Sequence, residues 1–409
     1  MSTKAPPRCL DLSRLVSRVG RGPLTGVDRV ERAYLDHLLA APGPLFSLVR
    51  MRLSYAVLDR AGTQALADRL AGDVPWGTPD LRARLTPKLS RQGQQVEADL
   101  RRLALGTCLR RNLYALLARH WPKGMRFLNV GHSNLTQRVL WAVSSQPDAE
   151  VSVLVHDMIP LDYPEYQRPG QPAKFERAMR MVSRYATRVI CNSEATRQRV
   201  VHYFNQWGRM PEALVAHLGV ETMRPDAAAL PDGLPPQRPY FIALGTIEPR
   251  KNHALLLDVW TQMEADGLAL PVLLIVGARG WNNEAVFTRL DSSPMIGRDI
   301  FELSGLGDQA LAALVQNATA MLFPSRAEGF GLPPAEALAL GTPAICADLP
   351  VYREFMGELP VYLNGNDRYL WAKTIHEMAT KGLGETRIEP GAAALPTWDA
   401  HFNQILSVT

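Results

Sequence analysis

The sequence predicts an α/β protein built from two doubly wound domains with parallel sheets. Short apolar segments of strand character alternate with longer segments of helical character, and this alternation occurs twice along the chain. Most of the short segments are continuously apolar, as expected for strands that are buried on both faces. A chain of 409 residues is also long enough for about two to three domains, each with its own core.

The expected strands fall into two groups. In the first half they cover residues 8–12, 126–130, 150–156, 188–191 and 213–217, and in the second half 240–244, 272–276, 300–303, 320–323 and 343–346. Apolar residues recur with helical spacing in the segments 194–204, 253–263 and 309–316. Because ligands of open parallel sheets bind beyond the carboxyl ends of the strands, we expect a site in the cleft between two facing sheets.

A proline-rich linker separates the two groups of strands. The segment 225–239 is polar and turn-rich, and it contains five prolines. We therefore expect an N-terminal domain at 1–225, a linker at 226–239 and a C-terminal domain at 240–395. Residues 53–123 are expected to form a helical, basic insertion in the first domain.

Positive charge is concentrated in this insertion. The net charge of the chain is +5, whereas residues 82–123 contain ten Lys or Arg and two acidic residues, which gives +8 and leaves −3 for the remainder. Two interpretations remain open: a solvated basic helix face, or a surface for an anionic membrane or a charged acceptor. No nucleic-acid recognition module accompanies the charge, so we do not expect nucleic acid as a partner.

The cysteines and the apolar runs bear on the cellular compartment. The spacing of the four cysteines fits neither a metal site nor a redox motif, and most of them lie in apolar runs, which predicts buried free thiols (Cys9, Cys108, Cys191 and Cys346). No segment has the apolar core of a signal peptide or the ~20 apolar residues of a membrane span. We expect a cytoplasmic protein, soluble or resting on the inner face of a membrane.

The most informative segment is FPSRAEGFGLPPAE at 323–336. Glu328 ends a strand-to-helix loop, and Glu336 lies one turn into the following helix. Gly329 and Gly331 allow backbone amides to approach a ligand, and the two prolines suit a first helical turn. Free amides at a helix N-terminus bind anions. A phosphate there, flanked by two carboxylates that accept hydroxyl hydrogen bonds, indicates a sugar nucleotide.

Two cations lie in an equivalent loop of the same half. Residues 245–252, GTIEPRKN, connect an expected strand to an expected helix and contain Arg250 and Lys251. Two cations beside a helix N-terminus favour a diphosphate through charge-assisted hydrogen bonds. If a nucleoside diphosphate is the leaving group, positive charge at this position stabilises the transition state.

In the first half, a histidine and an aspartate follow the strand expected at 150–156. His156 and Asp157 lie where a cleft site is expected. His156 can donate a hydrogen bond to a transferred sugar or position an acceptor hydroxyl, and Asp157 can orient His156 or approach the acceptor. The alternative is a buried, satisfied histidine at a domain edge.

Other loops carry weaker indications. The glycines at 20–26 have the spacing G-x-G-x-x-x-G, which misses the dinucleotide fingerprint and gives a nicotinamide site little support. Thr25 or Gly26 is expected to cap the following helix, so that its amides face the cleft. Ser193 is a second expected helix cap, and Trp281 is expected either near a nucleobase or over the domain edge. P-loop, HExxH and GxSxG motifs are absent.

Together these segments resemble glycosyltransferase family 4, whose members are retaining enzymes of the GT-B fold with two facing Rossmann-like domains. The matching pieces span nearly the whole chain: TGVDRV at 25–30, HDMIP at 156–160, CNSE at 191–194, GTIEPRKN at 245–252, GARGW at 277–281 and EGFGLPPAE at 328–336. The last of these resembles the E-x7-E signature of the family. As a set in this order, the pieces are highly specific.

The resemblance implies a role for each site residue. Glu328 would contact the donor sugar and stabilise positive charge at its anomeric carbon, and Glu336 would hold the ribose hydroxyls. Arg250 and Lys251 would bind the diphosphate. His156 would bind the donor sugar from the other domain. The amides of Gly331 and Leu332 would help to bind the diphosphate. Gly26, Gly329 and Phe330 are further candidate donor-binding residues.

The resemblance also implies a donor, an acceptor and a final helix. The donor would be a nucleoside-diphosphate sugar, mannose-like by similarity to transferases of bacterial surface polysaccharide, and the acceptor a glycan or lipid-linked saccharide; neither a cofactor nor a metal is expected. Residues 396–409 would form a terminal helix that crosses back onto the first domain. Thr246 stands where many relatives have an arginine, and the insertion 53–123 has no assigned counterpart. The rival hypotheses are a sugar-nucleotide epimerase of the same fold, a nicotinamide-dependent dehydrogenase and a non-catalytic glycan- or membrane-binding protein.

Overall fold

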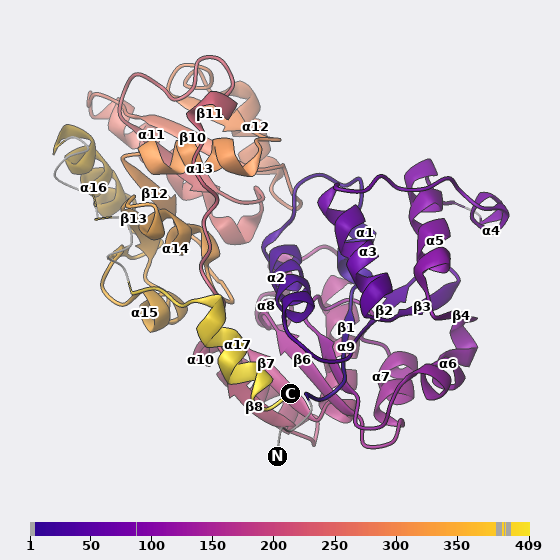
Figure 1. Cartoon of the computed structure of the whole chain (residues 1–409). Helices are drawn as coiled ribbons and strands as arrows, with labels where there is room; N and C mark the ends of the chain where they lie inside the picture. Colours follow the sequence, from indigo (N-terminus) through magenta and orange to yellow (C-terminus); the bar gives the residue numbers. More distant parts are fainter. Residues whose placement is uncertain (1–4, 87, 382–386, 388, 390–393) are drawn as a thin grey trace.

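The structure, a computed structural model, describes residues 5–86, 88–381, 387, 389 and 394–409. Two α/β domains lie side by side, each built on one sheet with helices on both faces (Figure 1). The first sheet contains residues before 216 and the second contains residues from 240 onward. The predicted fold class is confirmed.

The first domain has an eight-stranded sheet in the order β4-β3-β2-β1-β5-β6-β7-β8 within the described residues. Its strands are β1 (Arg8–Asp11), β2 (Leu45–Arg50), β3 (Ser54–Leu58), β4 (Gly106–Leu109), β5 (Arg126–Asn129), β6 (Glu150–Val155), β7 (Arg188–Cys191) and β8 (Glu212–Val215). Its helices are α1 (Ser13–Arg18), α2 (Gly26–Ala40), α3 (Arg60–Ala71), α4 (Leu81–Leu85), α5 (Arg91–Leu103), α6 (Leu113–His120), α7 (Gln137–Ser144), α8 (Ile159–Asp162), α9 (Gln171–Tyr185) and α10 (Glu194–Gln206).

The expectation of a purely helical insertion at 53–123 was wrong. This segment also supplies β3 and β4, which pair antiparallel and extend the sheet beyond β2. β4 escapes sequence patterning because it has only four residues and alternates between half-buried and exposed positions at the sheet edge. Edge strands of this kind lack the continuous apolar run that identifies a central parallel strand. β3 lies inside the sheet and is buried along most of its length.

The second domain has a parallel six-stranded sheet in the order β11-β10-β9-β12-β13-β14 in the described part of the chain. Its strands are β9 (Tyr240–Leu244), β10 (Val272–Val276), β11 (Ile300–Leu303), β12 (Ala320–Phe323), β13 (Ala344–Ala347) and β14 (Val361–Leu363). Its helices are α11 (His253–Ala265), α12 (Glu284–Ser292), α13 (Asp308–Asn317), α14 (Leu332–Ala339), α15 (Pro350–Met356) and α16 (Arg368–Lys381). The central strands are buried along most of their length, which explains why the sequence identified them.

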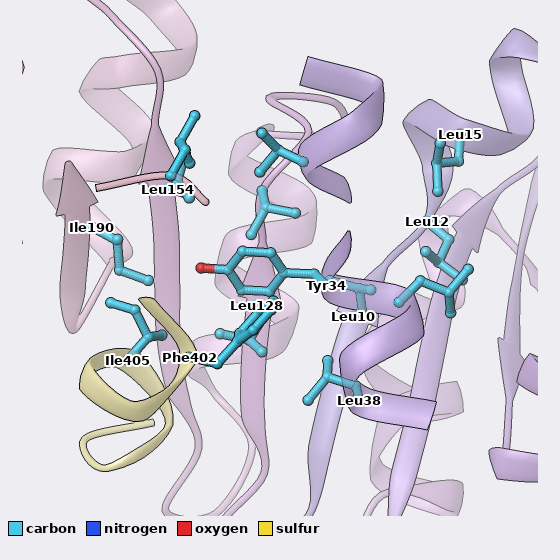
Figure 2. Packing of buried hydrophobic residues seen from close by; sticks show 14 of the residues in the cluster. Leu10, Leu12, Leu15, Tyr34, Leu38, Leu128, Leu154, Ile190, Phe402 and Ile405 are labelled. Carbon is cyan, nitrogen blue, oxygen red and sulfur yellow. The ribbon is translucent and has the colours of Figure 1, made fainter. Parts of the chain in front are cut away.

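The last helix, α17 (Trp398–Leu406), packs on the first domain (Figure 1). Phe402 lies 5.0 Å from the ring of Tyr34 on α2 in an edge-to-face contact. The Tyr34 hydroxyl is 2.7 Å from the Nε2 atom of His401. In Figure 2 the side chains of Phe402 and Ile405 lie beside Tyr34 and the leucines and isoleucine of the neighbouring strands. The apolar face of α17 thus completes the core of the first domain.

The chain crosses between the domains twice, and the two crossings touch. The amide of Val220 donates to the carbonyl of Pro396 at 2.9 Å. A Cβ atom on Gly219 would lie 2.4 Å from the backbone nitrogen of Trp398, so only glycine fits this contact. The segment after β8 and the segment before α17 are therefore side by side.

Three of the four cysteines are buried, Cys108 is half-buried, and all four are free thiols, in agreement with the expectation from their spacing. Among helices of the described residues, none combines the length and apolarity that crossing a membrane requires.

Candidate active site

The loop Gly329–Gly331 of the second domain is in direct contact with the first domain. A Cβ atom on Gly329 would lie 1.9 Å from the carbonyl oxygen of His156, so a side chain cannot be accommodated there. The carbonyl of Gly329 accepts hydrogen bonds from the hydroxyls of Ser193 at 3.0 Å and Thr196 at 3.3 Å. The predicted loops of the two domains therefore meet at one place.

Gly331 begins α14 with a φ of 119°, a conformation that favours glycine. A Cβ atom here would lie 2.6 Å from the ring of Tyr352. The first turn contains Leu332 and the two prolines, so the amides of Gly331 and Leu332 are the donors available at this helix end. The ring of Phe330 stacks on Phe355 with centroids 4.0 Å apart and is buried, so only its backbone can contribute to a donor site.

Glu328 lies between Arg250 and Lys251. One carboxylate oxygen of Glu328 is 2.6 Å from the Nη1 atom of Arg250, and the other is 2.6 Å from the Nζ atom of Lys251. Arg250 also pairs with Glu248 at 2.7 Å and donates to the carbonyl of Ala327 at 2.9 Å. The two cations thus belong to one buried network with Glu328 rather than pointing to solvent.

The charges in this network shift each other's pKa values. Burial alone would raise the pKa of Glu328, but Arg250 and Lys251 lower it to about 2. Burial lowers the pKa of Lys251, and Glu328 opposes that shift. Burial raises the pKa of Asp157 to about 6, against the opposing charge of Arg250. At neutral pH the site therefore holds an ionised Glu328 and an Asp157 within about one unit of its own titration.

His156 is 7% exposed, and its Nε2 atom is 2.7 Å from the carbonyl oxygen of Val130. Burial lowers its pKa to about 4, so the ring is neutral at physiological pH. An Nε2–H that donates to Val130 leaves Nδ1 without a proton. The carbonyl of His156 accepts a hydrogen bond from the side-chain amide of Asn192 at 2.9 Å, which fixes the loop.

Asp157 and Glu328 line the same cavity between the domains. Its volume is about 480 Å³, and its wall includes Asp162, Arg199 and Arg326. A cavity of this size is within the range of small-molecule sites. The Oδ1 atom of Asp157 accepts a hydrogen bond from the amide of Ile159 at 3.1 Å, which orients the carboxylate at the start of α8.

Glu336 forms an ion pair with a residue of the first domain. Its carboxylate is 2.7 Å from the Nη1 atom of Arg29 on α2. Both residues line a cavity of about 50 Å³ that also includes Leu244 and Asp308. This volume is too small for a nucleoside, so the Arg29–Glu336 pair has to open before one can bind. Burial raises the pKa of Glu336, and Arg29 opposes that shift.

The helix that carries Arg29 begins at Gly26, with Thr25 as the N-cap. The carboxylate of Asp28 accepts hydrogen bonds from the backbone amide and the hydroxyl of Thr25 at 2.8 and 2.7 Å. Sequence reasoning identified this helix start but not Arg29, although Arg29 lies one turn from Gly26 and hence at the same end of α2.

The structure also tests the expectations for Ser193 and Trp281. Ser193 caps α10, because its Oγ atom accepts a hydrogen bond from the amide of Thr196 at 3.0 Å. Trp281 covers the domain edge: its Nε1 atom donates to the carbonyl of Tyr166 at 2.8 Å, and Arg168 lies 4.7 Å above its ring.

Sequence reasoning missed Glu354 of α15, which accepts hydrogen bonds from the amides of Glu194 and Ala195 and pairs with His217 at 2.8 Å.

Comparison with protein families gives a match in the second domain. Residues 231–379 match the family described as glycosyl transferases group 1. The serotype-specific mannosyltransferase WbdA of Escherichia coli is 32% identical over 240 residues, which cover 55% of this chain and 29% of WbdA. The O-antigen chain mannosyltransferase B of Escherichia coli is 26% identical over 216 residues, 52% of this chain and 56% of that protein. The matched regions thus span from less than a third to just over half of these two curated relatives.

Solved structures give the fold. Sucrose-phosphate synthase from Thermosynechococcus elongatus aligns over 98% of this chain and 97% of its own, with a TM-score of 0.62 and 16% identity. Anabaena HepE in complex with UDP and glucose aligns over 98% of this chain and 95% of its own, with a TM-score of 0.59 and 15% identity. From these alignments and the two facing parallel-sheet domains, the chain has the GT-B fold.

Proposed function

We propose that the chain is a retaining glycosyltransferase of family 4 that moves a hexose, mannose by preference, from a nucleoside-diphosphate sugar to a hydroxyl of a glycan or lipid-linked saccharide. The observation that carries the proposal is the position of Glu328, held between Arg250 and Lys251 where the two domains meet. The group 1 family match and the mannosyltransferase names of the relatives support the reaction class and the sugar.

In this proposal the donor diphosphate occupies the start of α14. The amides of Gly331 and Leu332 would donate to one phosphate, and Arg250 and Lys251 would turn from Glu328 to the diphosphate oxygens. Negative charge grows on the departing diphosphate during transfer, so these cations bind the transition state more tightly than the ground state. No metal is required for this charge stabilisation.

The carboxylates act on the sugar and the acceptor. Glu328, which Arg250 and Lys251 keep ionised in the unliganded site by lowering its pKa to about 2, would stabilise positive charge at the anomeric carbon. Asp157, with a pKa of about 6, would accept a hydrogen bond from an acceptor hydroxyl in the same cavity. Neutral His156 would contact the sugar from the first domain, and Glu336 would bind the ribose once its pair with Arg29 opens.

Two experiments test the proposal. Thermal unfolding with GDP-, UDP- and dTDP-sugars identifies the donor, because a ligand of the folded state raises its stability. Transfer of radiolabelled sugar from that donor to a lipid and polysaccharide fraction is then measured for Glu328→Ala, Lys251→Ala and the exposed control Lys373→Ala. We expect loss of transfer in the first two variants only, and wild-type transfer in both would refute the assigned roles. A free isomerised sugar nucleotide as the product would instead identify an epimerase.

A further inference from the structure

A second and larger cavity lies in the first domain, away from Glu328. Its volume is about 740 Å³, and it is enclosed by α1 and the loop after it, by the end of β2, and by α5. β1 and β2 run parallel, so the cavity opens at the carboxyl edge of the first sheet. Asp157 follows β6 at this same edge.

The cavity is lined by five cations: Arg21, Arg50, Arg52, Lys88 and Arg110. Across the described residues, none of these five forms an ion pair. The acidic residue in the lining is Glu97, and its charge is already engaged: it accepts the backbone amide of Arg52 at 2.5 Å and lies 3.5 Å from Arg101. The cavity therefore carries uncompensated positive charge.

Apolar side chains form the rest of the lining. Met51, Val96 and Leu100 are buried at its base, and Leu53 at its rim is 55% exposed. An exposed leucine beside unpaired guanidinium groups fits a ligand that has both an anionic and an apolar part. Arginine in particular matches phosphate, because its planar fork donates two parallel hydrogen bonds.

The distance between this cavity and Asp157 indicates how far a ligand bound in the cavity has to extend. In the sheet, β2 is separated from β6 by β1 and β5, which makes three inter-strand steps of ~4.8 Å, or about 14 Å in total. A ligand anchored at Arg50 and Arg52 can therefore extend a short saccharide along the sheet edge to Asp157.

We propose that this cavity binds the phosphate and the adjoining apolar chain of a lipid-phosphate acceptor, whose saccharide end reaches the interdomain cavity. That the bound molecule is an acceptor rests on the proposed glycosyltransferase function. That the cavity binds an alkyl phosphate does not depend on this function. The basic insertion, which supplies Arg110, Lys88 and α5, then serves to recognise the acceptor.

The test uses dodecyl phosphate below its micelle concentration as the probe, titrated calorimetrically into the full chain. The double variant Arg50→Gln/Arg52→Gln is compared with Arg111→Gln/Arg119→Gln, which removes the same charge from exposed positions of the neighbouring insertion, outside the cavity lining. We expect the first variant to weaken binding at least tenfold and the control to change it less than twofold. Equal weakening by both variants would overturn the proposal, because the binding would then be general charge attraction.

Further probes identify the ligand class. Inorganic phosphate and octyl glucoside should each bind at least tenfold more weakly than dodecyl phosphate; inorganic phosphate binding equally well would exclude the apolar part. Vesicles with and without phosphatidylglycerol test the alternative that the basic residues bind an anionic membrane surface. If Arg50→Gln/Arg52→Gln loses vesicle binding but binds dodecyl phosphate as the wild type does, the cavity is not an acceptor site. Thermal stabilisation by the nucleotide sugar should be unchanged in this variant. A missing donor response in the wild type would count against the proposed function alone.

Discussion

Replacement of Glu328 by glutamine tests the buried charge network in two ways: we expect the free energy of unfolding to fall, and the affinity for a nucleoside diphosphate to stay equal or rise. The amide keeps the shape of the side chain but removes its charge, so Arg250 and Lys251 lose the carboxylate that lies 2.6 Å from each of them. The pKa of Glu328 falls from 4.5 to about 2 in the folded protein, and its side chain is 10% exposed. A shift of this size corresponds to roughly 3 kcal/mol of folding free energy at pH 7.

The direction of the pKa shift determines how the stabilisation by Glu328 changes with pH. Because the folded pKa lies below the unfolded one, the stabilising contribution is fully present above pH 4.5 and is lost as the pH falls toward 2. The free energy of unfolding of Glu328→Gln, measured by urea titration, should therefore be ~3 kcal/mol below wild type at pH 7 and about 2 kcal/mol below it near pH 3.5. The control Glu358→Gln, whose side chain is 84% exposed in a pair with Arg353, should differ little from wild type.

The affinity of Glu328→Gln for a nucleoside diphosphate, unlike its stability, should not fall. Once Glu328 is neutral, Arg250 and Lys251 no longer have to leave a carboxylate before they bind a diphosphate. The affinity for the nucleoside diphosphate should be equal to or higher than that of the wild type by calorimetry, while sugar transfer is lost. A stability difference that does not change between pH 7 and 3.5, or a nucleoside diphosphate that binds tenfold more weakly to the variant, would refute the reasoning.

The other predictions concern the same interface. Gly329→Ala places a methyl group against the carbonyl of His156, so we expect the domains to separate, with a larger radius of gyration by small-angle X-ray scattering and at least tenfold slower transfer. An unchanged radius and rate would show that the contact is dispensable. Asp157→Asn keeps the acceptor for the Ile159 amide but removes a charge whose pKa is raised to about 6. It should unfold at higher temperature than the wild type at pH 8 and at nearly the same temperature at pH 4, because the cost of the ionised form develops as the pH rises from the unfolded pKa of 3.8 to the folded pKa of about 6; equal melting at pH 8 would contradict this. Lys251→Met should weaken nucleoside diphosphate binding ~10–100-fold by calorimetry, the loss of one charge-assisted hydrogen bond, and binding within twofold of wild type would exclude Lys251 from the diphosphate site.

The sequence was sufficient for the elements whose pattern is local. The strands predicted at 188–191, 240–244, 272–276, 300–303 and 320–323 have the observed bounds. Four of them are buried along most of their length, and such strands are largely apolar. The strand at 300–303 is a partly buried edge strand. The terminal helix that the family resemblance implied within 396–409 is α17 (Trp398–Leu406).

The strands that were missed are β2, β3, β4 and β14. β4 and β14 lie at the sheet edges, where one face meets solvent and the apolar run breaks up. β2 and β3 are largely buried, so exposure does not explain why they were missed.

The candidate site shows the same limit. The loops that carry Glu328, Arg250 and His156 were identified because glycines, prolines and charges at strand ends form a local pattern. The partners of those residues depend on the approach of two domains. The hydroxyl of Ser193 meets the carbonyl of Gly329 across 136 positions of chain, and no local pattern relates them. The pairing of Arg29 with Glu336 is of the same kind.

The two adjacent crossings between the domains limit how the molecule can open. A single flexible connection would allow the lobes to swing in any direction, whereas we expect two connections that touch at Val220 and Pro396 to act together as a hinge, with its axis close to this contact. Rotation about that axis moves the far rim of the cleft most and the vicinity of Gly219 least. Opening and closing should therefore follow one arc, and each closure returns Gly329 to the same place against His156.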